Sequence, residues 1–312
     1  MATLNEVFSK LSVQRRYEVW FLRLGLADGS GAWWFRYLLM NRGREGWVAN
    51  SPGKPVQIWA SWFPVSGKPQ SFIQGFPLDQ LELSGRGQAP FHFRIGDNAI
   101  DEDSCRGVLN VGGHQIAWKL RYQSAFRVTL SSKGWIGFSR TPHSDAVFSG
   151  KVTFDGHSFV GDPLGFGVQG HNCGYRHRNF WTWAHAYFPS AGKPATTFEA
   201  LTYEMPFGLV FRKAVLWHER QQYVFRNLKE TPNRESMLWD FRCSTRKGTS
   251  LHARIDGRGQ SVLRLPYTKT DCSGSFQVAN NSLASASVAL ESASGETEAL
   301  ETANGAVLEV AG

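Results

Sequence analysis

The chain has 312 residues, of which 42% are hydrophobic and 19% charged, and this composition is that of a globular protein rather than a disordered one. No stretch reaches the ~20 apolar residues that a membrane-spanning helix needs, and the first residues lack the basic and apolar regions of a secretory signal. The net charge of +8 is spread without any basic run, so nucleic acid is not an expected partner. Peripheral contact with a membrane stays open, and the sequence predicts no oligomeric state.

The chain has four cysteines, Cys105, Cys173, Cys243 and Cys272, which lie far apart and form no C-x-x-C pair. This spacing indicates reduced thiols rather than a disulfide framework or a zinc site. We therefore expect a cytoplasmic protein.

The first predicted element is a short N-terminal helix. Leu4, Val7, Phe8 and Leu11 fall at i, i+3, i+4 and i+7, the spacing of one apolar helix face. From Tyr17 onward the pattern is that of strands, and the glycines of residues 27–31 permit a tight hairpin between two aromatic runs.

Short apolar or alternating runs continue from there, punctuated by Gly, Pro and Asp. Many short strands without helical runs between them indicate an all-β protein built as an antiparallel sandwich or barrel. Residues 283–310 are rich in Ala, Ser and Glu, and no Lys or Arg follows Lys269. This segment is either a pair of edge strands or a partly ordered acidic tail.

A possible internal repeat appears in two similar turns. FPVSGKP begins at Phe63 and FPSAGKP begins at Phe188, and each follows an aromatic strand. The Gly-Lys-Pro element is ordinary turn chemistry, but the spacing is also close to half of the chain. We therefore predict two domains, residues 1–150 and residues 151–312.

Two enzyme signatures are excluded. Residues 165–170 match G-x-G-x-x-G, but the following segment is interrupted by glycine and then strand-like, so no helix is available to bind a pyrophosphate. No G-x-S-x-G nucleophile elbow is present. We expect no cofactor.

His171, His177 and His185 gather in one short segment, which also suggests a metal site. On a strand, His177 and His185 would share a face but lie ~26 Å apart, too far to share one metal ion. A site that uses His171 with a distant ligand, as in a metal-dependent hydrolase, stays open. The favoured interpretation places Trp181, Trp183, His177 and His185 on one strand face that lines a cavity, and the alternative is a core strand.

Arg36, Arg212 and Asp240 interrupt apolar strands. A charge on a buried face is costly unless it is paired. These residues therefore either form a polar floor for a cavity or point to solvent on a one-sided sheet.

Residues 149–188 resemble a known family. A Gly-x-Val-x-Phe-Asp-Gly strand and turn is followed by a Gly-rich link, then His171, Asn172 and Gly174, and then the Trp181-x-Trp183 strand. This pattern is similar to the double-lipocalin group of hydroxyneurosporene synthase, tocopherol cyclase and the lipocalin-like Diels–Alderases. Cys173 stands where relatives would carry Trp. The resemblance implies two consecutive lipocalin-like antiparallel β-barrels or half-barrels, with a ligand pocket at or between them.

The leading functional hypothesis is an enzyme without a cofactor that hydrates, cyclises or isomerises a hydrophobic polyene, terpenoid or polyketide-like molecule. Such chemistry needs an apolar pocket, aromatic faces that stabilise a developing cation, and a proton donor or acceptor. The alternative is a lipocalin-like binder or carrier of a lipid or pigment. The catalytic candidates are His171, His185, Asn172, Asp162 and Tyr203. The candidates for substrate binding are Trp181, Trp183, Tyr175, His177, Trp34, Arg36, Trp59 and Trp62.

Overall fold

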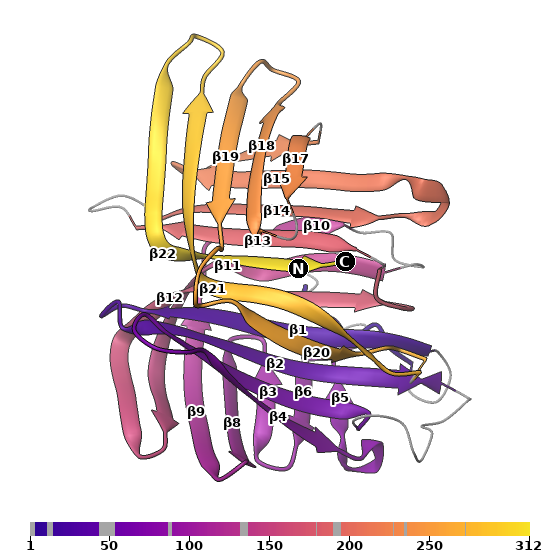
Figure 1. Cartoon of the computed structure of the whole chain (residues 1–312). Coiled ribbons are helices and arrows are strands. Elements are labelled where there is room, and N and C mark those ends of the chain that lie inside the picture. The colour runs from indigo at the N-terminus through magenta and orange to yellow at the C-terminus, as the bar shows by residue number, and fades with distance from the viewer. Residues whose placement is uncertain are drawn as a thin grey trace.

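The structure is a computed structural model that describes residues 4–10, 15–43, 54–86, 89–131, 137–178, 180–189, 195–226, 228–233, 236–271 and 273–312. The described chain forms two large antiparallel sheets of 12 and 10 strands, one above the other in Figure 1. Within these residues there is no α-helix, only the 3₁₀ turns η2 (Leu78–Gln80) and η3 (Pro206–Gly208). The described 3₁₀ turns are too short to span a bilayer.

The first sheet uses the chain up to Gly174, and the second begins at Trp181. The strands of the first sheet are β1 (Arg15–Leu26), β2 (Gly31–Arg42), β3 (Val56–Pro64), β4 (Gln70–Phe76), β5 (Glu82–Ser84), β6 (His92–Ile95), β7 (Asn98–Asp101), β8 (Ser104–Val111), β9 (His114–Gln123), β10 (Val128–Ser131), β11 (Gly137–Phe154) and β12 (His157–Gly174). Those of the second are β13 (Trp181–Phe188), β14 (Thr196–Glu204), β15 (Val210–His218), β16 (Gln221–Phe225), β17 (Lys229–Asn233), β18 (Leu238–Ser244), β19 (Ser250–Asp256), β20 (Leu263–Thr268), β21 (Ser275–Glu291) and β22 (Thr297–Ala311).

The second sheet repeats the topology of the first. The first has the order β4-β3-β2-β1-β12-β11-β9-β8-β7-β6-β5, with β10 beside β11. The second has the order β16-β15-β14-β13-β22-β21-β19-β18-β17, with β20 beside β21. If β1 is matched with β13, each strand of the second sheet has a counterpart in the first, and β10 matches β20. The chain is therefore internally duplicated in topology.

The two similar turns of the sequence do not mark this duplication. The first follows β3 and the second follows β13, whose counterpart is β1 rather than β3. Their likeness is turn chemistry, and residues 190–194 of the second lie outside the described residues. The predicted division into residues 1–150 and 151–312 stays a prediction.

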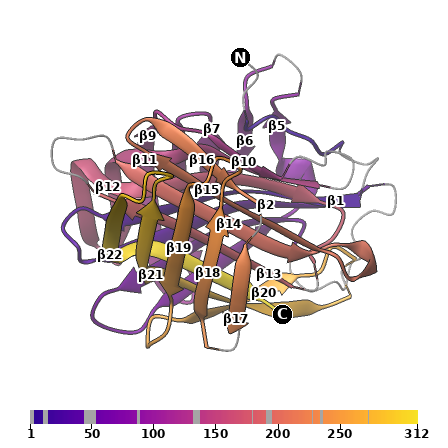
Figure 2. The same cartoon turned by 90° about the horizontal axis from the view of Figure 1, so that it is seen from above.

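Each half sends one short strand across to the other (Figure 1). Val128 and Leu130 of β10 pack with Leu201 and Val215 of the second sheet. Leu265 and Tyr267 of β20 pack with Trp59 of the first sheet. Figure 2 shows the two sheets from above, with β20 near the C-terminus. The space between the sheets is thus enclosed by elements of both halves.

The G-x-G-x-x-G motif is part of β12 and serves close packing between strands. A Cβ atom at Gly165 or Gly167 would collide with the carbonyl oxygen of Gly25 or Arg23 on β1, and one at Gly170 would collide with the ring of Phe21. The glycines are needed because β1 and its side chains approach β12 too closely for a side chain there.

The expected N-terminal helix is wrong. Residues 4 and 5 form a turn and residues 6–10 have no regular structure, while Leu11 lies outside the described residues. The Glu18 carboxylate accepts hydrogen bonds from the backbone N–H groups of Phe8 and Ser9, and Val7 N–H donates to the carbonyl of Gly85. These partners hold the backbone in place of a helical ladder.

The proposed acidic tail is also corrected. Residues 283–291 belong to β21 and residues 297–310 to β22, with a turn between them, and β22 is an interior strand between β13 and β21. Cys105, Cys173 and Cys243 are buried free thiols, and Cys272 lies outside the described residues.

Candidate functional site

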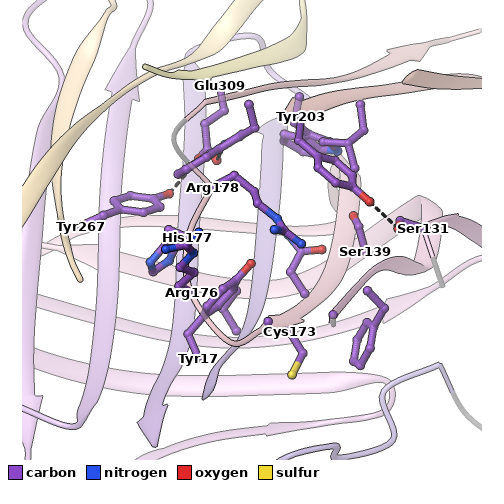
Figure 3. Close-up of a pocket in the computed structure, with 18 of the residues that line it drawn as sticks. Tyr17, Ser131, Ser139, Cys173, Arg176, His177, Arg178, Tyr203, Tyr267 and Glu309 are labelled. Atoms are coloured by element: carbon purple, nitrogen blue, oxygen red, sulfur yellow. Dashed lines mark hydrogen bonds between the residues drawn. The ribbon is translucent and has the colours of Figure 1, made fainter. Parts of the chain in front are cut away.

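A cavity of about 280 Å³ lies between the two sheets (Figure 3), and the exposed side chains of Phe207 and Leu209 in its lining mark its opening. Its walls come from β1, β2 and β12 of the first sheet, from β13, β14 and β22 of the second, and from the exchanged strands. The residues that line it are Tyr17, Val19, Phe21, Trp34, Arg36, Ser131, Gly137, Phe138, Ser139, Asn172, Cys173, Gly174, Arg176, His177, Arg178, Trp181, Trp183, Leu201, Tyr203, Met205, Phe207, Leu209, Tyr267 and Glu309.

Alternation along β1 decides what reaches this cavity. Tyr17, Val19 and Phe21 face it, whereas Glu18 and Trp20 face the interior of the first sheet. Successive side chains of a strand point to opposite faces, and directly paired residues of antiparallel strands share a face. The pairing of β1 with β12 therefore carries the same division onto β12.

The apolar wall is aromatic. Phe21 stacks on Trp34 with 5.1 Å between ring centroids, and Trp183 meets Phe21 edge-on at 5.3 Å and lies 5.8 Å from Trp34. These three rings join the two sheets at the inner end of the cavity. Rings arranged in this way offer both shape and π-faces to a ligand.

A buried carboxylate forms the polar floor. Glu309 on β22 accepts hydrogen bonds from the Tyr267 hydroxyl at 2.8 Å, from Trp181 Nε1 at 2.9 Å and from Asn280 Nδ2 at 3.4 Å. Burial raises the pKa of Tyr267 well above its usual value, so this phenol stays protonated at neutral pH. Figure 3 shows the contact between Tyr267 and Glu309 at the side of the cavity.

His177 and Tyr17 stack face to face at the wall, with 4.2 Å between their centroids. Burial, with a contribution from the nearby Arg36 cation, lowers the pKa of His177 to about 3. The imidazole is therefore neutral near pH 7, and its Nδ1 has no hydrogen-bond partner. Burial also raises the pKa of Tyr17, so its hydroxyl remains a donor.

Across the cavity, the Tyr203 hydroxyl lies 2.9 Å from Ser131 Oγ, which the exchanged strand β10 contributes (Figure 3). Asn172 presents a buried Oδ1 atom without a hydrogen-bond partner. A buried polar atom without a partner costs free energy unless a ligand or water satisfies it. Asn172 and His177 thus leave polar atoms available to a bound molecule.

Behind the wall lies a second buried carboxyl group. Glu199 Oε1 accepts hydrogen bonds from Trp183 Nε1 at 2.9 Å and from Thr141 Oγ1 at 2.7 Å, while its Oε2 has no partner. Burial raises the pKa of Glu199 to about 7. His185, paired with Glu199 in the sheet, donates from Nε2 to the carbonyl of Ser144 at 2.7 Å. Burial lowers the pKa of His185 to about 3.

Seven of the predicted site residues line the cavity. One is the catalytic candidate Asn172, another is the catalytic candidate Tyr203, and the remaining five were predicted to bind substrate. Those five are Trp34, Arg36, His177, Trp181 and Trp183. Trp181, Trp183 and His185 alternate along β13, but His177 precedes this strand and His185 is not among the lining residues.

His171 lies on the other side of β12, inside the first sheet. Its Nε2 is 2.9 Å from Glu18 Oε1, its Nδ1 is 2.9 Å from the carbonyl of Leu4, and its ring stacks on Trp20 at 4.7 Å. Neither His171 nor Glu18 has any exposed side-chain surface. The one-residue step from Asn172 to His171 reverses the face, so the histidine predicted to be catalytic does not reach the cavity.

The other predicted residues also lie outside the cavity lining. His185 is buried behind it, and Trp59 packs against both Arg36 and Tyr267. Trp62 stacks on Trp33 in the first core. Asp162 is exposed and bonds Ser149, and Tyr175 is exposed beneath the guanidinium of Arg16.

Several lining residues were missed by the sequence analysis. Tyr267 and Glu309 are distant in sequence from the His and Trp segment, and Glu309 was counted among the acids of a possible tail. A signal was present in the alternating run that contains Glu309, because it places one charge on an otherwise apolar strand face. Within the described residues, no three His, Cys, Asp or Glu side chains group as metal ligands would.

Comparison with known proteins was informative only at the level of structure. No protein-family model matches the sequence, and no curated protein matches it. Kievitone hydratase from Nectria haematococca aligns over 100% of this chain and 92% of its own, with a TM-score of 0.59 and 12% identity. CghA, solved with Sch210972, aligns over 95% of this chain and 88% of its own, with a TM-score of 0.62 and 10% identity.

A putative AttH from Nitrosomonas europaea aligns over 96% of this chain and 93% of its own, with a TM-score of 0.52 and 11% identity. The chain has the double-lipocalin-like fold of these proteins. The resemblance found in the sequence is thus confirmed for the fold. Identities of 10–12% carry no activity from these proteins to this chain.

Proposed function

We propose that this protein is an enzyme that hydrates, cyclises or isomerises a hydrophobic polyene, terpenoid or polyketide-like substrate in the cavity between its two sheets. The observation that carries the proposal is the buried Glu309–Tyr267 pair, 2.8 Å apart, at the wall of an otherwise largely aromatic cavity. An apolar cavity with a few convergent polar groups is the usual form of a small-molecule site.

Each part of the wall has a role in this chemistry. The rings of Phe21, Trp34 and Trp183 fold a flexible substrate into one conformation and offer π-faces to developing positive charge. Asn172 Oδ1 orients a substrate hydroxyl or N–H group. These contacts would hold the reacting carbons close to the polar floor.

The proton transfer is assigned to hydroxyl groups of the cavity rather than to His171 or His185, which do not line it. Tyr267 donates its proton to Glu309, so its oxygen can accept a proton from the substrate as Glu309 takes up its own. Tyr203, hydrogen-bonded to Ser131 on the opposite wall, delivers a proton to the other end of the reacting bond. Hydration and isomerisation both need this pair of opposed donor and acceptor groups.

The test is turnover by purified protein of a panel of polyenes and polyene-containing polyketides, followed by liquid chromatography and mass spectrometry. Glu309→Gln keeps the shape of the floor but removes the base, so turnover should fall by about 10²-fold or more. Glu291→Gln on the exposed end of β21 is the matched control and should leave turnover unchanged.

Two outcomes would contradict the proposal. Equal turnover by the Glu309→Gln variant would remove Glu309 from the chemistry. A ligand that binds in the cavity and is always recovered unchanged would instead identify a lipocalin-like binder or carrier. Trp183→Ala should weaken binding in either case, because it removes a wall common to both functions.

A further inference from the structure

The charges that line the cavity are strongly unequal. Arg36, Arg176 and Arg178 contribute three guanidinium groups, and Glu309 is the one carboxylate among the described lining residues. Glu309 already accepts hydrogen bonds from Tyr267, Trp181 and Asn280, and among the described residues no arginine forms an ion pair with it. The cavity therefore holds about two positive charges more than its own residues balance.

Arg36 is the deepest of these cations. Its side chain is 3% exposed, and its guanidinium lies 4.0 Å from the ring centroid of Tyr267 and 4.5 Å from that of Trp59. These contacts with two aromatic rings use the positive charge of the group but none of its N–H donors. Its NH1 atom is buried and has no hydrogen-bond partner. A buried cation with an unused donor edge is costly in an empty site and well placed for an anion.

The other two arginines continue this positive potential toward the opening. Arg178 is half-buried, extends toward the middle of the cavity and lies 5.6 Å from the centroid of Tyr203, as Figure 3 shows, while Arg176 is exposed at the rim. His177 between them is kept neutral, so it adds no charge of its own. An approaching anion thus meets positive potential from the rim to the floor.

We propose that the substrate carries an acidic oxygen group, a carboxylate or an enolate of a 1,3-dicarbonyl, which binds Arg36 at the floor while its hydrophobic part fills the aromatic wall. The inference rests on the proposed function, since it names the substrate class of the same cavity. Guanidinium binds planar delocalised oxyanions through two parallel hydrogen bonds, and both of these groups have that geometry.

The experiment compares matched probes by calorimetry or Trp fluorescence at about pH 8, where both acids are ionised. One pair is dodecanoic acid with its methyl ester, and the other is a 2-acyl-cyclohexane-1,3-dione with its O-methyl enol ether. The anion of at least one pair should bind about tenfold or more tightly than its neutral partner. The pair that shows the larger ratio identifies the carboxylate or the enolate as the preferred group.

Variants assign the preference to a residue. Arg36→Met should reduce the ratio of acid to neutral affinity to about 1 while the neutral probe keeps its affinity, and Arg36→Lys should restore part of the ratio. Arg106→Met, at an exposed position of β8, is the matched control and should keep the full ratio. If Arg36→Met does not fold, Arg178→Gln, at a half-buried position, should lower the ratio by about threefold or more.

The outcomes separate the two proposals. Equal binding of acid and neutral probes by the unaltered protein overturns the inference and leaves the proposed function standing. An undiminished ratio in Arg36→Met overturns the role of Arg36. If neither acids nor neutral probes bind, both the inference and the proposed function fail.

Discussion

Buried polar groups lie on both sides of β1, and they differ in whether the protein itself supplies their hydrogen-bond partners. On the inner face, the Glu18 carboxylate accepts hydrogen bonds from Phe8, Ser9 and His171, so its oxygens are fully used within the protein. On the cavity side, Arg36, Asn172 and His177 each leave a polar atom without a partner. Unpartnered buried atoms occur on the inner face too, at Ser9 Oγ and Trp20 Nε1, but those of Arg36, Asn172 and His177 belong to residues that line the cavity. The comparison shows that a conspicuous buried histidine pair is a weaker sign of function than unused donors and acceptors around a cavity.

The largest expected effect tests the inner face. Glu18→Ala would leave His171 and two backbone N–H groups buried without an acceptor, and it should lower the free energy of unfolding by about 3–5 kcal/mol. Urea denaturation measures this loss, with Glu291→Ala on the surface as the control. A variant that keeps its stability but loses ligand binding would mean that the pair serves the site after all.

The next effect is the pH dependence of Glu199, which lies behind the cavity wall and bonds Trp183. Its pKa is raised from 4.5 to about 7 in the folded protein, so the native carboxyl keeps a proton that the unfolded chain releases between these values. The free energy of unfolding should therefore decrease as the pH rises from 4.5 to 7. The total decrease is about 3 kcal/mol, because the pKa differs between the unfolded and folded states by 7 minus 4.5. Glu199→Gln should remove this decline.

Denaturation of both proteins at a series of pH values provides the measurement. Thr141→Val, which deletes one hydrogen bond to the same carboxyl, is a useful companion because it should retain the slope. If the free energy of unfolding changes with pH in the same way for the unaltered protein and for Glu199→Gln, the pKa of Glu199 is not raised by folding.

A pair of variants separates the faces of β1 directly. Phe21→Ala should cost about 2 kcal/mol of stability, because the lost ring borders an existing cavity, and it should weaken binding of hydrophobic probes. Trp20→Ala, one residue away on the inner face, should cost more, about 4 kcal/mol, and leave probe affinity unchanged. Equal effects of the two variants on binding would contradict the division of β1 into a structural and a functional face.

The smallest effect concerns Asp162, which the sequence placed among the catalytic candidates. Its side chain is exposed and bonds Ser149, far from the lining residues in the sheet. Asp162→Ala should change stability by no more than about 0.5 kcal/mol and should leave probe binding and turnover unchanged. A clear loss of turnover would restore it as a candidate.

The sequence predicted the all-β class and the places of Trp181 and Trp183 in the cavity lining, because alternation and turn residues are local signals. It could not predict the face of His171, since that depends on the pairing of β12 with β1, which is distant along the chain. Leu4, Val7 and Phe8 are spaced as on one face of a helix. The backbone N–H groups of Phe8 and Ser9, however, donate to the Glu18 carboxylate instead of to helical carbonyls. Long-range partners decided each of these cases.

The same limit explains the polar floor. Glu309 and Tyr267 come from β22 and β20, and only the sheet topology brings them beside Trp181 and Arg36. The Ala and Ser of residues 283–310 suggested an edge strand or a tail. They are instead the small residues of the second core, where Ala284, Ala286 and Ala306 are buried.

The exchange of β10 and β20 between the halves has a consequence for biosynthesis. Val19, Phe21 and Trp34 leave the ribosome early, but the side of the sheet that they form is covered only when the second half has been made. Glu309 arrives on β22, the last strand described. Because nascent chains tend to fold from the N-terminus, the first half would expose an aggregation-prone aromatic surface to solvent for most of translation. We expect the nascent first half to depend on a holdase chaperone until β22 is released.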